Sequence, residues 1–363
     1  MLNEAIVKNE EKAVFALRGL YKQYGYLPFK MSKFEEYDLY VRNKDFLVSD
    51  SVITFNDTDG ALMALKPDVT FSIIKNTTDT QGSKSKVYYN ENVYRISGTT
   101  HRFKEIMQAG LECIGDIDVY DIFEVVYLAA KSLASLSDSF VLDISHMGIV
   151  KAVLDGVSDD ESFKSRITSL LAEKNIHEAR AACISAGLPS DVSEKIIGFV
   201  GLHGRMDAVI EKLESTCDTA TAKEALDELK KLAALLEKTE LYGKIRLDFS
   251  VVNDMNYYNG IVFKGFLDGI PEGVLSGGRY DALMKRLGRS SGAIGFALYL
   301  DLLEGLGAVR SDRDVDVLLV YSDTTDPLTV AAKTEELISS GLSVSAQKTV
   351  PDKLRYGQII TLE

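Results

Sequence analysis

Hydrophobic and polar positions alternate with different periods along the chain, and each period predicts a type of element. The spacing at the N-terminus predicts an amphipathic helix that ends near Gly25. Residues 26–41 then predict a strand, a turn and a short helix. Residues 52–75 predict two strands joined by an Asp-Gly turn and followed by the start of a helix, because Asp-Gly accepts the positive φ angles of a tight hairpin.

Strand pairs and helices continue in the next part of the chain. Residues 86–115 predict a hairpin with a polar Gly-Thr-Thr loop, and residues 117–136 predict a helix from apolar spacings of three and four. Strands resume at 244–266, while 273–288 and 292–306 each predict a strand or turn that leads into a helix. Antiparallel pairs interspersed with helices indicate an α+β fold rather than alternating β-α-β units.

Two parts of the chain depart from this pattern. Residues 146–240 are charged, helical in spacing and poor in β-branched runs, so they predict an inserted helical subdomain. The insertion would split a core into residues 1–145 and 241–308. Residues 312–363 predict a small α/β unit of strand, helix and strand, followed by a polar tail. About fifty residues are few for a complete domain.

Composition argues against several classes of protein. A net charge of −13 disfavours nucleic acid as a partner, because phosphate binding depends on basic surface. Cys113, Cys183 and Cys217 are far apart, and the charged N-terminal helix does not resemble a secretion signal, which indicates reduced thiols and a cytoplasmic location. Four scattered histidines lack metal-ligand spacing, and no stretch has the length and apolarity of a membrane span. We therefore expect no metal, no cofactor and no membrane contact.

Five segments, in a fixed order, resemble the histidyl-tRNA synthetase family of class II aminoacyl-tRNA synthetases. The resemblance covers roughly residues 5–305, and the insertion falls where that family inserts a helical domain. It implies an α+β, class II synthetase-like antiparallel sheet flanked by helices, with a helical insertion and a small truncated C-terminal α/β unit. The segments are ALKPDVT (64–70), the second class motif VYRISGTTHRFKEIMQAGLECIG (93–115), the histidine signatures NYYNGIVF (256–263) and SGGRYDAL (276–283), and the third class motif GAIGFALYLDLL (292–303).

The resemblance implies a pocket for L-histidine. Its carboxylates and glutamine can accept from an α-ammonium or an imidazole N–H, and its phenols can donate and accept. The implied ligands are Asp68, Thr70, Gln108, Glu112, Tyr257, Tyr258 and Tyr280.

Without the resemblance, the same residues have plainer explanations. The tyrosines would pack in a sheet, Gln108 and Glu112 would form an exposed pair, and Asp68 would cap a helix. If Tyr257 and Tyr258 lie on a strand, they point to opposite faces, so a kink or bulge is needed for both to reach one ligand.

The positions that bind the nucleotide in the synthetases have changed. Arg95 stands where the resemblance places a phosphate-binding arginine, and Arg102 and Lys104 follow it. Leu302 replaces the arginine of the third motif, and Asn253 replaces an arginine at the reacting carboxylate. Losing one preorganised donor costs about 2.7–4 kcal/mol of transition-state stabilisation, so two losses predict that adenylation is suppressed.

A synthetase-like fold with altered catalytic positions resembles a known group of paralogues, the ATP phosphoribosyltransferase regulatory subunits. This resemblance implies a non-catalytic partner of a short catalytic subunit in histidine biosynthesis, a hetero-octamer around a synthetase-like dimer, and feedback by L-histidine. The unit at 312–363 resembles only the beginning of an anticodon-binding domain, which implies no anticodon recognition. A divergent histidyl-tRNA synthetase and a stand-alone histidine-binding protein remain alternatives, and histidine could instead bind at the contact with the catalytic subunit.

Overall fold

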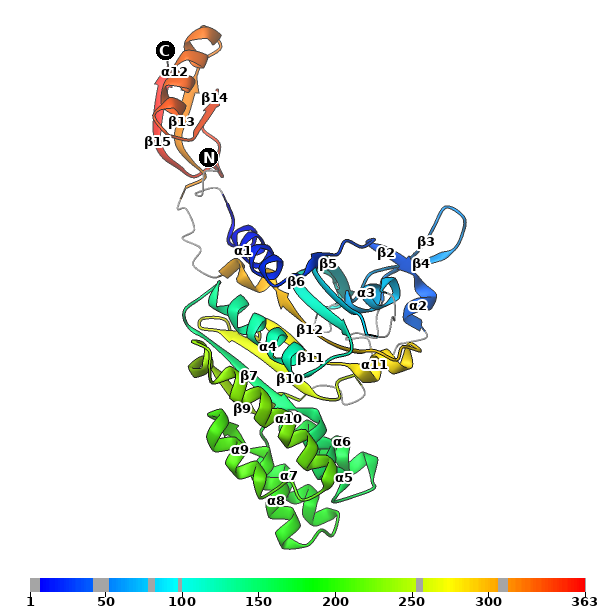
Figure 1. Ribbon diagram of the computed structural model, residues 1–363. Helices are drawn as coiled ribbons and strands as arrows, with labels where there is room; N and C mark the ends of the chain where they lie inside the picture. The colour runs from blue at the N-terminus through cyan, green and yellow to red at the C-terminus, as the bar shows by residue number, and fades with distance from the viewer. Residues whose placement is uncertain are drawn as a thin grey trace. The chain divides into compact units, whose positions relative to one another are not determined.

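The chain divides into two compact units, Met1–Leu306 and Gly307–Glu363, shown in the computed structural model of Figure 1. Asn253 and residues 98 and 99 of the predicted Gly-Thr-Thr loop lie outside the described residues. The structure describes residues 7–41, 52–77, 82–96, 100–252, 257–305 and 313–362.

The first unit is built on a large, mainly antiparallel sheet. The hairpin predicted at 86–115 is its longest pair, β5 with β6, and two other pairs, β1–β5 and β7–β9, are parallel. This mixed sheet confirms the predicted α+β class. Within the described residues its nine strands run in the order β1 (Leu27–Pro28), β5 (Lys84–Ile96), β6 (Phe103–Gly115), β12 (Gly292–Tyr299), β11 (Leu275–Arg279), β10 (Ile261–Leu267), β7 (Phe140–His146), β9 (Ile245–Asp248) and β8 (His203–Gly204).

Helices pack on both faces of this sheet. One face meets the main hydrophobic core, to which α1 (Asn9–Gln23) and α4 (Val119–Ala134) contribute. The other face meets a smaller cluster formed with α2 (Tyr37–Val41), α3 (Thr70–Asn76) and α11 (Asp281–Arg286). Along β6 the alternation of side chains sends Leu111 to the main core and Ile114 to the smaller cluster. Even-numbered residues of β6 therefore face the smaller cluster.

A small second sheet lies beside α2 and α3 in Figure 1. Its strands run in the order β2 (Phe34–Glu36), β4 (Leu62–Leu65) and β3 (Thr54–Asn56). The Asp-Gly turn predicted between β3 and β4 is confirmed, because the two strands pair antiparallel and Gly60 has a φ of 81°.

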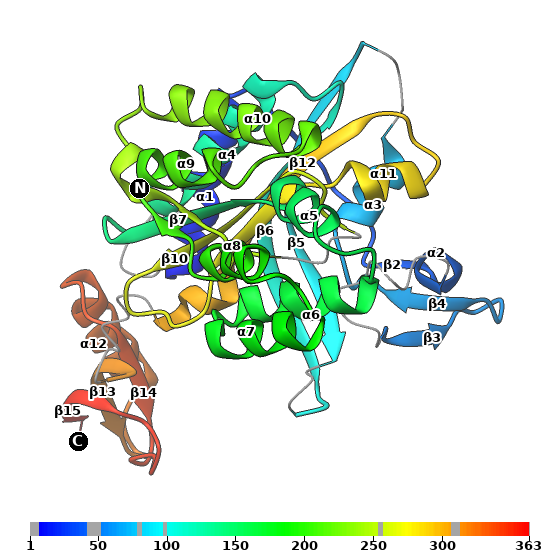
Figure 2. The same ribbon diagram turned by 90° about the horizontal axis from the view of Figure 1, so that it is seen from below.

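The helical insertion connects two neighbouring parallel strands. β7 ends at His146, and β9 pairs beside it with Leu142 opposite Ile245. Figures 1 and 2 show the insertion helices gathered at one end of the sheet, and their buried residues continue the main core. No helix in the described ranges is long and apolar enough to cross a membrane. The connection contains α5 (Met147–Asp155), α6 (Glu161–Ala172), α7 (Ile176–Ser185), α8 (Ser190–Val200), α9 (Met206–Glu214), α10 (Ala220–Leu236) and the 3₁₀ helix η3 (Tyr242–Lys244).

The second unit is a parallel sheet with one helix. The predicted strand, helix and strand are confirmed as β13 (Val315–Tyr321), α12 (Pro327–Ser339) and β14 (Val344–Gln347). The predicted polar tail is wrong, because β15 (Tyr356–Leu362) pairs in parallel with β13 along its whole length. β13 is therefore the central strand, with β14 and β15 on either side.

Candidate functional site

The candidate site is centred on Glu112, near the middle of the sheet. Its side chain is 2% exposed. Thr70 Oγ1 donates to Glu112 Oε1 at 3.0 Å, and the Tyr280 hydroxyl donates to Oε2 at 2.5 Å. Gly295 of β12 lies opposite Glu112, and a Cβ added there would stand 1.7 Å from Oε2. Gly295, in the segment that resembles the third class motif, therefore leaves the space that this carboxylate occupies.

Three separate elements bring these groups together. Thr70 begins α3, Glu112 lies on β6, and Tyr280 directly follows β11. Gln108 is four residues before Glu112 on the same strand face, is 3% exposed and lies opposite Tyr299 of β12. The interpretation of Gln108 and Glu112 as an exposed pair is therefore wrong.

The tyrosine pair lies beside this carboxylate, but not on a strand. Tyr257 and Tyr258 precede β10, which begins at Ile261. Their ring centroids are 4.5 Å apart, and the Tyr257 ring is 5.8 Å from that of Tyr280. A Cβ at Gly278 would stand 2.7 Å from the Tyr258 ring, so this glycine is what allows the ring to lie there. A strand bulge is not required for both rings to lie on the same side, because Tyr257 and Tyr258 lie in a turn and not on a strand.

Asp68 lies at the edge of the same group. Its Oδ1 accepts from the Phe71 N–H at 3.2 Å in the first turn of α3, which agrees with the helix-capping interpretation. Burial raises the pKa of Asp68, and the charge of Arg95 opposes that rise. Arg95 lies close because its Nε donates to the Pro67 carbonyl at 3.0 Å.

Burial dominates the electrostatics of the site. It raises the pKa of Glu112 to about 8, although the bonds from Tyr280 and Thr70 oppose the rise. It also raises the pKa values of Tyr257, Tyr258 and Tyr280, with the charge of Glu112 adding to the rise in all three and that of Asp68 in Tyr257 and Tyr258. The phenols therefore stay protonated, while Glu112 gains or loses its proton near neutral pH. Such a site favours a ligand that brings a positive charge or an N–H donor.

The predicted nucleotide cations have other roles or none. Arg95 is held by the Pro67 carbonyl, whereas Arg102 is exposed. Lys104 Nζ lies 3.1 Å from Asp301 Oδ2, so its charge is paired with a carboxylate of the same chain at the surface. Leu302 lies in the 3₁₀ helix η4 (Leu300–Gly305) and packs against the main core. Among the described residues, Arg95 and Lys104 therefore have separate protein partners, whereas the donors of the amino-acid region converge on Glu112.

Sequence analysis missed three residues that shape the site. Gly278 and Gly295 provide the space for Tyr258 and Glu112, and Tyr299 lies opposite Gln108 with its pKa raised by burial. Gly278 lies in β11 and Gly295 in β12, and both belong to segments that resemble the synthetase family. A glycine inside a strand often marks a place where another group approaches closely, so these two glycines could have been predicted. Tyr299 carried no such signal.

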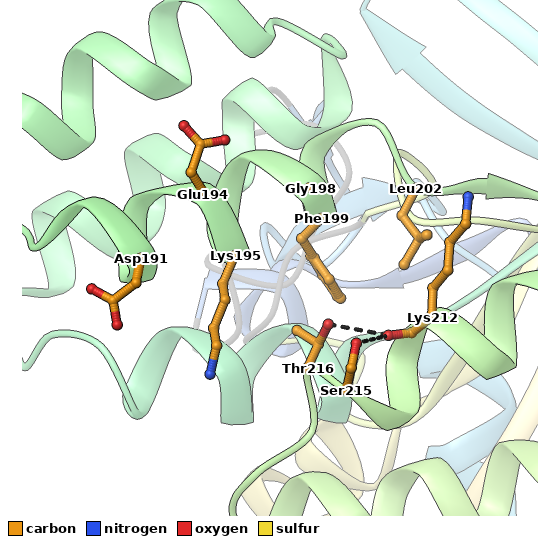
Figure 3. A pocket seen from close by; sticks show the side chains of 9 residues that line it. All are labelled: Asp191, Glu194, Lys195, Gly198, Phe199, Leu202, Lys212, Ser215 and Thr216. Carbon is orange, nitrogen blue, oxygen red and sulfur yellow. Dashed lines mark hydrogen bonds between the residues drawn. The ribbon is translucent and has the colours of Figure 1, made fainter.

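A hollow lies in the insertion between α8 and α9 (Figure 3). Two of its charged lining residues are engaged: Lys195 Nζ lies 2.6 Å from Asp218, and Glu194 pairs with Arg180. The hydroxyls of Ser215 and Thr216 donate to the Lys212 carbonyl, as the dashed lines show. No group of three or more potential metal ligands occurs in the described ranges. The buried polar cluster around Glu112, on which donors from two other elements converge, is therefore the candidate site.

Comparisons with known proteins agree with the motif order. The model of the histidyl-tRNA synthetase family matches residues 2–303. The ATP phosphoribosyltransferase regulatory subunit of Oceanobacillus iheyensis is 29% identical over 290 residues, which cover 79% of this chain and 71% of that protein.

Solved structures extend the similarity to the fold. The structure titled an ATP phosphoribosyltransferase regulatory subunit/histidyl-tRNA synthetase from Bacillus halodurans aligns with a TM-score of 0.78 at 25% identity, covering 97% of this chain and 93% of that one. A chain of the ATP phosphoribosyl transferase (HisG:HisZ) complex from Thermotoga maritima aligns at 0.62 and 19% identity over 80% of this chain and 97% of that one, which concerns the fold alone. The class II synthetase-like fold is confirmed. The chain belongs to the histidyl-tRNA synthetase family, and its relatives place it among the ATP phosphoribosyltransferase regulatory subunits of that family.

Proposed function

We propose that this regulatory subunit senses L-histidine in the pocket around Glu112 and passes the signal to a short-form ATP phosphoribosyltransferase catalytic subunit. The observation that carries the proposal is the contrast between two regions of the first unit. Glu112, Thr70 and Tyr280 form a buried polar cluster, whereas the half-exposed Lys104 pairs with Asp301 and the partly buried Leu302 packs against the main core. Such an arrangement supports binding of the amino acid without its activation.

The chemistry of the pocket suits histidine. An α-ammonium and an imidazole N–H supply donors for Asp68, Gln108 and Glu112, and the phenols of Tyr257 and Tyr258 can donate or accept. Glu112 already accepts from Thr70 and Tyr280, yet a carboxylate has about four acceptor sites and can take a further donor. A ligand without these groups would leave buried polar atoms unpaired, so the pocket discriminates strongly.

Feedback requires histidine to bind one state of the assembly better than another. A differential affinity of about 1–3 kcal/mol per coupled site is typical of such regulation. We include in the proposal a synthetase-like dimer of this chain within a hetero-octamer. The proposal also includes a cytoplasmic location, which is supported by the free, buried thiols of Cys113, Cys183 and Cys217.

The test is a kinetic assay of the short catalytic subunit from the same source, with and without this chain, while histidine is titrated. We expect the chain to raise activity and to change the response to histidine. No change in either property would overturn the proposal.

Two further measurements separate the alternatives. Histidine-dependent ATP–pyrophosphate exchange would indicate a divergent synthetase, and we expect none. Calorimetric binding of histidine without any effect on the catalytic subunit would indicate a stand-alone histidine-binding protein.

A further inference from the structure

A side chain from the helical insertion contacts the end of β11, the strand that directly precedes Tyr280. Glu228 lies on α10, and its Oε2 is 3.1 Å from the Arg279 guanidinium at the end of β11. Its other oxygen, Oε1, is 3.1 Å from His146 Nε2. Glu228 and Arg279 are 28% and 22% exposed, so the pair is partly shielded from water.

The bond to His146 has a defined direction. His146 Nδ1 accepts from the Gly148 and Ile149 N–H groups and thereby caps α5. With Nδ1 used as an acceptor, the neutral ring carries its proton on Nε2 and donates it to Glu228. Burial acts to raise the pKa of Glu228, but His146 and Arg279 outweigh it and lower that pKa. Glu228 thus ties the last helix of the insertion to the start of its first.

Arg279 extends the connection to both sides of the pocket. Its Nε donates to Asp281 Oδ2 at 2.8 Å, and Asp281 accepts from the Ala293 N–H at 3.0 Å. The Asp281 N–H donates to Asn259 Oδ1 at 2.8 Å, and Asn259 Nδ2 lies 3.3 Å from Asp281 Oδ2. Tyr280 stands between Arg279 and Asp281 in the chain. The two pocket segments are therefore fixed to each other by this cluster.

The turn with the tyrosine pair is held from the insertion side as well. Asn259 directly follows Tyr258, and its N–H donates to the Arg279 carbonyl at 3.2 Å. The next carbonyl, of Gly260, accepts from the Met147 N–H at the start of α5 at 2.8 Å. A Cβ at Gly260 would stand 3.0 Å from the Arg279 side chain, so the arginine lies directly against this turn.

We propose that Glu228 is a positioning residue for the amino-acid pocket, and that the position of the helical insertion thereby sets the affinity of the pocket for histidine. The inference rests on the proposed function. Glu228 holds Arg279, and Arg279 holds the segments that carry Tyr280 and Tyr258. Because coupling between two sites is reciprocal, histidine also strengthens the attachment of the insertion.

The test uses the full chain with Glu228→Gln, which keeps the size of the side chain and removes its charge. The matched control is Glu224→Gln, an exposed residue one turn earlier on α10. Calorimetry should show histidine affinity about tenfold weaker for Glu228→Gln and unchanged for Glu224→Gln. Equal affinity in wild type and Glu228→Gln would overturn the inference.

Hydrogen exchange distinguishes positioning from simple loss of stability. In the wild type, histidine should protect amides at the start of α5 and in α10 as well as those around Glu112. In Glu228→Gln the protection around Glu112 should remain, while that in the helices is lost. Protection of the helices in the variant would overturn the inference even if its thermal stability fell.

A second variant tests the path through Arg279. Arg279→Lys keeps the charge but loses the fork that bridges Glu228 and Asp281. The double variant with Glu228→Gln should lose no more histidine affinity than the weaker-binding single variant. If the losses of the two single variants add up in the double variant, Glu228 does not act through Arg279. If the wild-type protein binds no histidine, both the proposed function and this inference fail. If the wild type binds histidine and Glu228→Gln binds it with the same affinity, only this inference fails.

Discussion

The region around Glu112 and the region around Leu302 both include residues of β6, yet they differ in how their polar groups are used. Around Glu112, donors from Thr70 and Tyr280 converge on one buried carboxylate. Around Leu302, an apolar side chain packs into the core and Lys104 is paired with Asp301. The first region concentrates buried polar groups on one acceptor, whereas the second combines a half-exposed ion pair with an apolar contact to the core.

Under the proposed function, this difference means that amino-acid binding and amino-acid activation are separable on one scaffold. The fold depends on the sheet and its two hydrophobic clusters, which do not require the nucleotide cations. The pocket depends on glycines that leave room for polar side chains. Losing cations therefore removes chemistry without disturbing the pocket.

Filling the space beside Glu112 should have the largest effect. In Gly295→Ala the new Cβ would meet Glu112 Oε2 at 1.7 Å and the Leu111 carbonyl at 2.5 Å, so backbone and carboxylate must both move. We expect a loss of about 3 kcal/mol or more in the free energy of unfolding, measured by urea denaturation, together with loss of histidine binding.

The control for that change is Gly198→Ala on α8, where the space around the new Cβ is open. It should leave stability unchanged or raise it by up to about 1 kcal/mol, because alanine favours a helix more than glycine does. A Gly295→Ala protein as stable as this control would contradict the role given to Gly295.

The pH dependence of stability should be the next largest effect. The pKa of Glu112 is about 8 in the folded chain against 4.5 ordinarily, so as pH rises between these values the unfolded chain ionises first and folding stability falls. Glu112→Gln should remove this slope, and the gap between the two proteins should grow with pH by up to about 1.4 kcal/mol per pH unit. Urea denaturation at several pH values measures it.

Histidine should flatten the same slope in the wild type, because a bound positive charge stabilises ionised Glu112. Glu105→Gln, on the exposed part of β6, is the control and should keep the wild-type slope. A wild-type slope in Glu112→Gln would assign the titration to another group.

The smallest effect on stability should come from a change in the region around Leu302. Lys104→Ala removes a pair in which the lysine is 52% exposed, so the free energy of unfolding should change by no more than about 0.5–1 kcal/mol. ATP affinity, measured by calorimetry, should not change, and Arg102→Ala should behave in the same way. A marked loss of ATP affinity in Lys104→Ala alone would show that this lysine still serves a nucleotide.

Local pattern and motif order predicted most of the first unit. The β5–β6 hairpin, the Asp-Gly turn and the insertion helices follow from spacing that neighbouring residues enforce. β15 was missed because its side chains are mostly exposed and its identity as a strand comes from pairing with β13, about forty residues earlier. A strand defined by a distant partner leaves little trace in its own composition.

The site was predicted in its members but not in its geometry. The resemblance named Glu112 and the tyrosines, whereas burial of Gln108 and the turn that holds Tyr257 depend on how separate elements meet. Glu228 is 82 residues from His146 and 51 from Arg279, and it lies in a charged helix where any glutamate resembles a surface residue. Only the folded arrangement distinguishes it from its exposed neighbour Glu224.

The parallel pairing of β7 with β9 sets a minimum size for the connection between them. Two adjacent parallel strands can be joined only by a crossover of a dozen or more residues, commonly a single helix. α10 has 17 residues and packs against both α4 and α5, so this one helix has the length that such a crossover needs. The helices α6 to α9 therefore go beyond what the sheet itself requires of the connection.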